Sequence, residues 1–289
     1  MSSTLRLPSL ALAALVAAAS CAMSHARGDD TVDTAKVERV EEIAIGRDPD
    51  AGERVVADAA VGSIELRVDP SVRSPRIEAE FTVDGRDAKD LERRQQLVRL
   101  YASRAADQSI VVQPIFPGKK MDRDDVVIRI IVPKSADTSL RTAQGTLTVT
   151  GTTGKLRLNA KSGAIRVEGH KGALDATAGD GAITLAGIDG TVRASATAGE
   201  ISLTLAEGTD FPFELESRNG AIRVEVGAEF DGAVRMHTTG GRIEVSDPGD
   251  RSRTPQSGDF TRTVEIGSAG GQSDIRTTTG AIRLSIRRK

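Results

Sequence analysis

Residues 163–190 read GAIRVEGHKGALDATAGDGAITLAGIDG, and this stretch decides the fold of the 289-residue chain. A glycine opens each nine-residue unit, and the residues two and four places later are apolar, as in Ile165 and Val167. Successive side chains of a strand leave opposite faces, so an apolar period of two is typical of a strand with one buried face. Each unit is therefore predicted to be one short strand and a turn. The spacing holds for seven glycines in succession: Gly145, Gly154, Gly163, Gly172, Gly181, Gly190 and Gly199.

The sixth residue after each glycine separates two kinds of unit. It alternates between glycine and alanine in the order Gly151, Ala160, Gly169, Ala178, Gly187 and Ala196. We therefore expect an all-β solenoid with two short strands in each coil of about 18 residues. Coils of this length place Arg157, Asp175 and Arg193 in one outward column of alternating charge. Stacking every nine-residue unit would instead set Arg157 against Arg166, which is a destabilising contact between like charges.

Residues 1–26 have the pattern of a secretory signal peptide, with Arg6 before an apolar run and small residues at the end. The sequence is compatible with two alternative processing sites. Cleavage after Ala26 would release a chain without cysteine, whereas the small residues before Cys21, the single cysteine, make it a candidate lipidation site. We expect an exported protein of the periplasm or cell surface, and an outer-membrane lipoprotein if Cys21 carries lipid.

The composition disfavours several classes of partner. With 39 Lys and Arg against 41 Asp and Glu, the formal net charge is −2, and no clustered basic surface for nucleic acid is expected. No basic segment is long enough to hold an anionic membrane, so membrane contact is expected only through lipid on Cys21. The chain has no Trp, one Tyr and six Phe, which disfavours sites that stack sugars or bases on aromatic rings.

The N-terminal half divides into two regions after the signal peptide. Residues 27–52 are polar and charged and are predicted to be a tether. Residues 53–140 form short alternating runs, which predict an N-terminal antiparallel β cap. Within this cap, residues 87–108 change to a helical period with Leu91 and Val98 on one stripe. We expect one amphipathic helix there, sealing the open end of the solenoid.

Residues 141–289 carry the solenoid repeats to the C-terminus, with looser spacing after Leu205. The segment 246–259 is rich in Pro, Gly, Ser and Asp and is predicted to be a loop that interrupts the repeats. Loops carry partner sites more often than strands do, so this loop is the first place to look for one. Strand edges at the C-terminal end could accept a partner's strand, although the basic residues 287–289 argue against it.

No motif points to reaction chemistry, and we expect no catalytic, cofactor-binding or metal-binding residues and no cofactor. The turns lack the Gly-Gly-x-Gly-x-Asp pattern of calcium β-rolls, and calcium needs six to eight oxygen ligands. His170 and His237 lie outside any triad or metal-ligand pattern and are expected to be surface residues. Some glycan-active enzymes are β-helices with charged residues clustered on one sheet, but a salt-bridge ladder explains the alternating column that contains Arg157.

Four features carry a resemblance to a known family: the strands 62–66 (GSIEL) and 126–133 (VVIRIIVP), the run of Gly-x-Ile/Leu-x-Val/Leu units, and the closing segment 275–284 (IRTTTGAIRL). Over residues 53 to 286, the chain resembles the bacterial putative-adhesin family, a β-strand-repeat domain of unknown function related to the head GIN domain proteins. The resemblance implies a right-handed β-solenoid on an envelope protein, with no catalytic residues to carry over.

The expected function is that of an exported, non-catalytic cell-envelope protein, an adhesin-like binding or scaffolding module rather than an enzyme. Its partner would be a protein or glycan of the envelope. Two alternatives stay open, because a fold does not fix a function. One is an envelope-stress or signalling partner that docks a membrane protein, and the other is a glycan-active β-helix enzyme.

Overall fold

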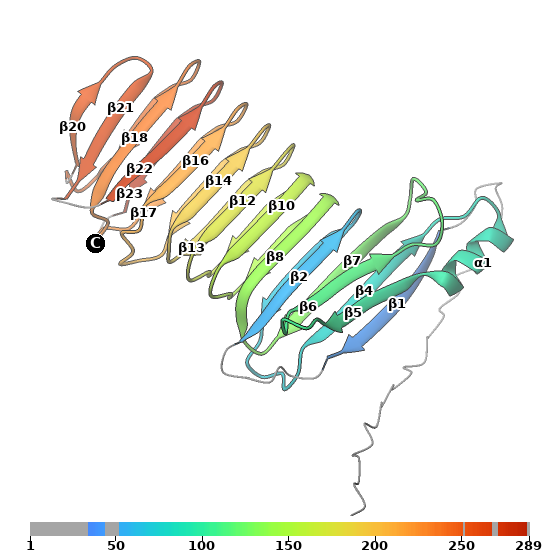
Figure 1. The fold of residues 1–289 in the computed structure, drawn as a ribbon. Coiled ribbons are helices and arrows are strands. Elements are labelled where there is room, and N and C mark those ends of the chain that lie inside the picture. Colours follow the sequence, from blue (N-terminus) through green and yellow to red (C-terminus); the bar gives the residue numbers. More distant parts are fainter. Residues whose placement is uncertain (1–33, 44–51, 251, 268–270, 288–289) are drawn as a thin grey trace, which may run out of the picture.

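Two β-sheets face each other along most of the molecule and form an elongated stack of coils (Figure 1). The computed structural model describes residues 34–43, 52–250, 252–267 and 271–287. The predicted signal peptide and the candidate lipidation site Cys21 lie outside the described residues.

The first sheet, sheet A, has eleven strands. From the N-terminal end of the stack, its order is β1 (Ala35–Glu42), β4 (Arg76–Val83), β7 (Asp125–Val132), β3 (Ser63–Val68), β9 (Leu147–Thr150), β11 (Ile165–Glu168), β13 (Ile183–Ile188), β15 (Ile201–Leu205), β17 (Ile222–Val226), β23 (Ile282–Ile286) and β19 (Ile243–Ser246).

The second sheet, sheet B, has twelve strands. From the same end, its order is β5 (Arg99–Arg104), β6 (Ile110–Ile115), β2 (Glu53–Ala59), β8 (Ser135–Gln144), β10 (Leu156–Ser162), β12 (Leu174–Ala178), β14 (Val192–Ala196), β16 (Phe213–Ser217), β22 (Gly271–Thr277), β18 (Gly232–Thr238), β21 (Thr261–Ile266) and β20 (Ser252–Ser257).

The strand register confirms the predicted two-strand coil. In sheet B, Leu156 lies beside Leu174, and in sheet A, Ile165 lies beside Ile183, both in parallel pairs. Each partner is therefore 18 residues away in the chain, and adjacent nine-residue units lie in opposite sheets. The all-β solenoid with two strands per coil is the observed architecture.

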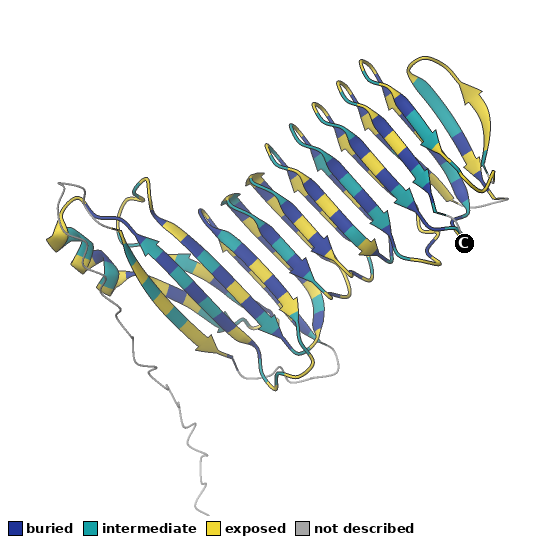
Figure 2. Cartoon of the chain, turned by 180° about the vertical axis from the view of Figure 1, so that it is seen from behind, coloured by how far each residue is buried: buried dark blue, intermediate teal, exposed yellow. Residues whose placement is uncertain are grey.

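A single hydrophobic core fills the space between the sheets. Buried and exposed residues alternate along the strands, so that apolar side chains point inward and polar ones outward (Figure 2). Ile165, Ile183 and Ile201 form one inward row and are each 0% exposed. Burying such a side chain stabilises the fold by ~1.5 to 3 kcal/mol, and each coil completes the burial of its neighbours.

A column of glycines runs along one corner of the stack. A Cβ atom on Gly181 would lie 1.9 Å from the carbonyl oxygen of Gly163, although the φ of Gly181 lies outside the left-handed region. Close approach of backbones, rather than backbone conformation, therefore requires glycine at this position. The members in spatial order are Gly62, Gly145, Gly163, Gly181, Gly199, Gly220, Gly280 and Gly241.

Three residues before each glycine of the column, the regular coils have an alanine, such as Ala178 before Gly181. Where Thr or Ser replaces this alanine, its buried hydroxyl group binds the backbone at the same corner. Thr142 Oγ1 donates to the carbonyl of Gly62 at 2.9 Å, and Ser217 Oγ donates to that of Gly199 at 3.0 Å. Thr277 and Thr238 do the same at the carbonyls of the next two glycines of the column. These four side chains are nearly inaccessible to water, and the backbone carbonyl that each hydroxyl binds replaces the lost hydrogen bond to water.

The N-terminal end of the stack is built out of chain order. The coil β2–β3 pairs in parallel with β6 and β7 on one side and with β8 and β9 on the other. Within the predicted antiparallel cap, only β4 and β5, on the outer side of the stack, pair exclusively antiparallel with their neighbours, and β1 joins β4 from outside the predicted range. Strands β2, β3, β6 and β7 belong to solenoid coils, which corrects the predicted boundary at residue 140.

The predicted tether over residues 27–52 is wrong for residues 35–42. These residues form β1, which pairs with β4 along its whole length, with Val37 beside Phe81. Arg39, two places later on the same face, donates to the backbone carbonyls of Gln95 and Val98 at 3.5 Å each. The alternation of Val37 and Arg39 gives β1 an inward face despite its high charge.

The predicted helix over residues 87–108 is also too long, because α1 spans only Ala88–Leu97. From Arg99 the chain alternates and pairs antiparallel with β6, and Leu100 is 8% exposed. Of the predicted apolar stripe, Leu91 lies in the helix, whereas Val98 follows it, between α1 and β5. Helix α1 lies against β1 and β4 at the N-terminal end of the stack (Figure 1).

The buried residue of α1 is a charged one, Arg94. Its guanidinium donates to the carbonyls of Pro117 and Lys119, at 2.8 and 3.1 Å, and forms an ion pair with Asp124. The Asp124 carboxylate also accepts the backbone N–H of Asp84 at 3.0 Å. A buried charge persists only when such partners surround it, so Arg94 fixes the helix to the 117–124 loop.

The C-terminal end mirrors this departure from chain order. The last coil of the chain, β22–β23, lies between the coils β16–β17 and β18–β19. The predicted loop over residues 246–259 is partly wrong, because its residues 252–257 form β20, which pairs antiparallel with β21 as a hairpin. The last described strand, β23, therefore lies inside the stack, and the β20–β21 hairpin lies at its tip.

We expect Gly181→Ala to destabilise the protein by at least ~2 kcal/mol, because the new methyl group overlaps the Gly163 carbonyl and separates two coils. Gly227→Ala is the matched control, since its Cβ would meet other atoms only at 3.8 Å, and it should change stability by less than about 0.5 kcal/mol. Chemical denaturation measures both. Equal effects would contradict the close approach at the glycine column.

Candidate binding groove

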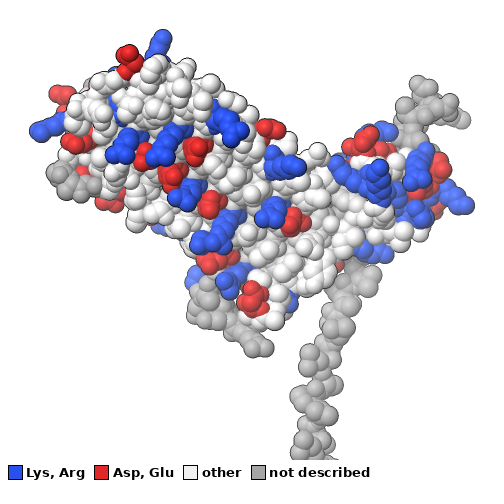
Figure 3. Space-filling view, turned by 45° about the horizontal axis from the view of Figure 1, so that its top comes forward, with Lys and Arg blue, Asp and Glu red and all other residues white. Residues whose placement is uncertain are grey.

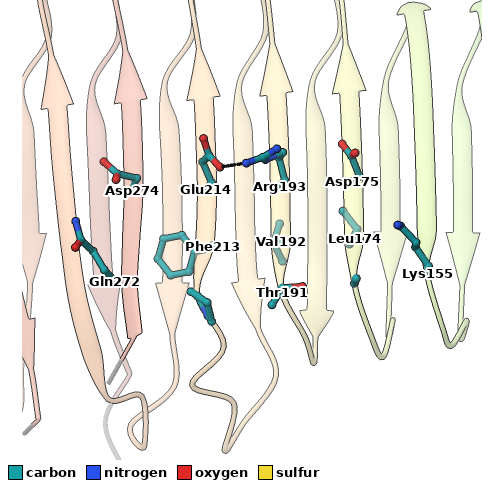
Figure 4. A pocket seen from close by; sticks show the side chains of 12 residues that line it. Lys155, Leu174, Asp175, Thr191, Val192, Arg193, Phe213, Glu214, Gln272 and Asp274 are labelled. Atoms are coloured by element: carbon teal, nitrogen blue, oxygen red, sulfur yellow. Dashed lines mark hydrogen bonds and ion pairs between the residues drawn. The ribbon is translucent and has the colours of Figure 1, made fainter. Parts of the chain in front are cut away.

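The outer face of sheet B is hollowed across β12, β14, β16 and β22. The groove has a volume of about 520 Å³ and opens to solvent. Figure 4 shows Lys155 at one end of the groove and Gln272 and Asp274 at the other. Its lining residues are Lys155, Ala173, Leu174, Asp175, Thr191, Val192, Arg193, Pro212, Phe213, Glu214, Gln272 and Asp274.

The groove lies beside a corner of the stack that is longer than in the regular coils. Gly220 follows Gly199 by 21 residues in the glycine column, where Gly199 follows Gly181 by 18. The longer corner is anchored by buried Thr209, whose Oγ1 lies 3.2 Å from Asp189 Oδ1. It brings Pro212 to the groove wall and leaves the neighbouring Phe211 45% exposed.

The charged column predicted from the sequence forms part of the groove. Strand register places Arg157 beside Asp175 and Asp175 beside Arg193, as expected. The ion pair lies elsewhere, because Arg193 binds Glu214 on β16, with Nη2 to Oε2 at 2.5 Å and Nε to Oε2 at 3.0 Å. The order of charges in the predicted ladder is therefore correct, but the ion pair is formed with Glu214, which the sequence analysis did not include.

Sequence reasoning missed Glu214 and Asp274. The longer corner displaces Glu214 from the 18-residue spacing, and the insertion of the last coil brings Asp274 beside Glu214 across 60 residues of sequence. The same register sets Asp274 beside Arg235 of β18, and Arg276 lies 3.4 Å from the Asp274 carboxylate. Basic and acidic residues alternate as far as Glu214, but Glu214 and Asp274 then lie side by side as two acidic residues. In chain order Arg193, Glu214 and Arg235 keep the alternation at a spacing of 21 residues, and this was the available signal.

The groove charges are solvated and partly paired. The side chains of Arg193 and Glu214 are 69% and 49% exposed. The hydrogen bond from Arg193 to Glu214 raises the pKa of Arg193 above its ordinary value, with a further contribution from the charge of Glu214. Exposed pairs of this kind contribute little to stability, so these side chains are available for recognition.

Ion pairs also bridge strands on the outer face of sheet A. Arg283 on β23 binds Glu244 on β19 with Nη2 to Oε2 at 2.7 Å, and this hydrogen bond lowers the pKa of Glu244. On the face that Figure 3 draws, acidic and basic side chains are interspersed over the C-terminal half of the molecule, without a broad area of one sign.

The two histidines occupy different environments. His237 is exposed on β18, as expected, whereas His170 is 0% exposed, and its prediction as a surface residue is wrong. His170 lies in the same inward column as Thr152 and Ile188, and its Nδ1 is 3.0 Å from Thr152 Oγ1. Burial lowers the pKa of His170, and its Nε2 has no hydrogen-bond partner within the described residues.

Within the described ranges, no three His, Cys, Asp or Glu side chains lie close enough together to hold a metal ion. In the same ranges, no helix is long and apolar enough to cross a membrane. The lining side chains of the groove offer ionic contact and hydrogen bonding to a ligand.

Comparison with known proteins identifies one family. The model of the family described as Toastrack DUF4097 matches residues 14–285. A structure described as a "putative cell adhesion protein" from Clostridium sporogenes ATCC 15579 is 12% identical, with 86% of this chain and 99% of that chain covered and a TM-score of 0.35. A "putative adhesin" from Bacteroides fragilis NCTC 9343 is 10% identical, with 86% and 96% covered and a TM-score of 0.39. No curated protein matches the chain.

Acid should destabilise the protein through His170. Burial depresses the pKa of His170 in the folded protein, so the unfolded chain takes up the proton more readily. The stability that the neutral, buried His170 contributes is therefore fully present above the ordinary pKa of about 6.5 and is lost as the pH falls below it. The slope is at most about 1.4 kcal/mol per pH unit for one proton. His170→Asn should reduce the loss of Tm between pH 7.5 and 5.5. If exposed His237→Asn reduces it equally, the assignment to His170 fails.

Proposed function

Since the chain belongs to the Toastrack DUF4097 family, we propose that it is an exported, non-catalytic binding or scaffolding module of the cell envelope. It acts in the periplasm or at the cell surface and presents the outer face of sheet B to a protein or glycan. The export signal is the pattern of residues 1–26. The mature chain either begins at a lipid-modified Cys21 or begins at Arg27 after cleavage at Ala26. Intact mass spectrometry of the exported chain distinguishes these two forms.

The groove across β12, β14, β16 and β22 is the observation that carries this proposal. It is a concave site on a sheet held rigid by its neighbours on both sides, and concave sites on rigid scaffolds are where ligands bind. Its polar side chains offer both signs of charge, because Lys155 and Arg193 line it together with Asp175 and Glu214. Solvated charges of this kind suit reversible recognition of a polar ligand, whereas catalytic groups are typically desolvated and held together.

The proposal is tested by binding of the purified mature chain to isolated envelope fractions, namely outer membranes and peptidoglycan. We expect saturable retention by one fraction. Asp175→Lys should reduce it at least about tenfold, because it reverses a groove charge and leaves Arg157, residue 175 and Arg193 all positive.

Glu168→Lys is the matched control. It makes the same change of net charge at an exposed position of β11, on the opposite sheet, and should leave retention unchanged. Retention that both variants reduce equally would show a non-specific effect of charge and contradict a site in the groove. Absence of retention by every fraction would contradict the binding function itself.

A further inference from the structure

The two sheets end at different places at the C-terminal tip of the stack. Sheet A stops at β19, whereas sheet B continues past β18 with two more strands, β21 and β20. The inner face of β21 therefore extends beyond the last described strand of sheet A. Figure 1 shows the β20–β21 hairpin at this tip.

The outer edge of β19 carries free backbone groups. Ile282 N donates to the carbonyl of Arg242 at 2.8 Å, so the backbone groups of Arg242 and Glu244 face β23. Those of Ile243 and Val245 alternate with them and face away from β23. Among the described residues, no strand pairs with this edge. Two N–H groups and two carbonyls are thus positioned to receive another strand.

The overhanging face of β21 offers side chains to such a strand. Arg262 and Val264 lie beside Met236 and Val234, which point into the core. Val264 is itself 0% exposed, so of these two only the partly exposed Arg262 is open to an added strand. The carbonyl of Phe260 accepts the N–H of Thr238 at 2.9 Å, so Phe260 continues this inward row, yet it is 52% exposed. A large aromatic side chain in an inward row stays exposed here because no strand of sheet A in the described ranges lies opposite it.

Arg262 makes this face selective for charge. Its Nε is buried and has no hydrogen-bond partner within the described residues. An arginine at an inward position would be covered by an added strand, and covering it is favourable only when a carboxylate pairs with its guanidinium.

The other edges at this tip are protected. Strand β20 carries Pro255 and Arg253, and proline and charge on an edge strand prevent pairing. Arg287 lies away from β19, because its N–H donates to the carbonyl of Val226 at 3.0 Å and its guanidinium to that of Leu205 at 2.7 Å. The expectation that the basic tail blocks the terminal edge is therefore wrong for Arg287 at β19, and residues 288 and 289 lie outside the described residues.

We propose that β19 accepts an extended segment of a partner protein as an added strand of sheet A. The turn over residues 239–242 joins Thr238 to Ile243 and sets them at one level of the coil. A residue added beside Ile243 then faces Phe260, and one added beside Val245 faces Arg262. The partner segment carries an apolar residue and an acidic residue two places apart, and its backbone bonds supply the affinity while these side chains supply the selectivity.

The test uses the full mature chain and a fluorescently labelled peptide, acetyl-Thr-Glu-Thr-Leu-Thr-Glu-Thr-amide, whose symmetric pattern fits either strand direction. A second peptide has Lys in place of both Glu residues. We expect the Glu peptide to bind about tenfold more tightly than the Lys peptide, as measured by fluorescence anisotropy, because only the former pairs with Arg262.

Two variants separate the backbone and charge contributions. Val245→Pro removes an outward N–H without breaking a bond to β23 and should abolish binding of both peptides, with Val245→Ala as the control that keeps the N–H. Arg262→Glu should reverse the preference between the peptides, and this result stands even if the proline variant fails to fold. Asp175→Lys alters the groove and should leave peptide binding unchanged, so the two sites are tested independently.

Binding of neither peptide by the wild-type chain would overturn the proposal, as would binding that persists in folded Val245→Pro. Sedimentation velocity of the wild-type chain checks for a second copy as the occupant. We expect a monomer. A concentration-dependent dimer that Val245→Pro removes would assign the edge to self-association and overturn the assignment to a partner protein.

Discussion

Backbone contact between successive coils at the glycine column is the constraint on which the structure depends. Where Gly181 passes the carbonyl of Gly163, there is no room for a side chain, and this proximity repeats along the corner from Gly62 to Gly241. Coils that touch there are held in register, so their strands pair residue by residue. In-register pairing aligns the aliphatic rows of the core and the charged columns of the outer faces.

The regular part of this arrangement could be predicted from the sequence, and the ends could not. The repeat length follows from glycine spacing and apolar alternation, because both patterns report local geometry. The coil β22–β23 lies between coils formed by earlier parts of the chain, and this position depends on pairing between distant segments, which the spacing of residues does not encode. The surface prediction for His170 is wrong for a different reason: polarity favours an exposed position, whereas the 18-residue spacing places His170 in the inward column of buried Thr152 and Ile188.

Function is expected where the regularity ends. The candidate groove lies beside the longer corner that contains Thr209 and Pro212, and two of its charges, Glu214 and Asp274, come from strands outside the exact repeat. The free edge of β19 lies at the tip where sheet A stops before sheet B. The central coils supply rigidity and alignment, while the irregular coils supply concavity, unpaired backbone groups and exposed side chains.

Disulfide trapping tests the account most directly, because it reports which coils are neighbours. The mature chain has no cysteine after cleavage at Ala26, so exposed pairs can be introduced without interference. Neighbouring strands lie ~4.8 Å apart, within the range that a disulfide spans, and next-nearest strands lie beyond it. The account predicts that Glu216→Cys with Arg276→Cys forms a disulfide in the folded protein, because β16 lies beside β22. A disulfide between Glu216→Cys and His237→Cys instead would show that the coils stack in chain order and would contradict it.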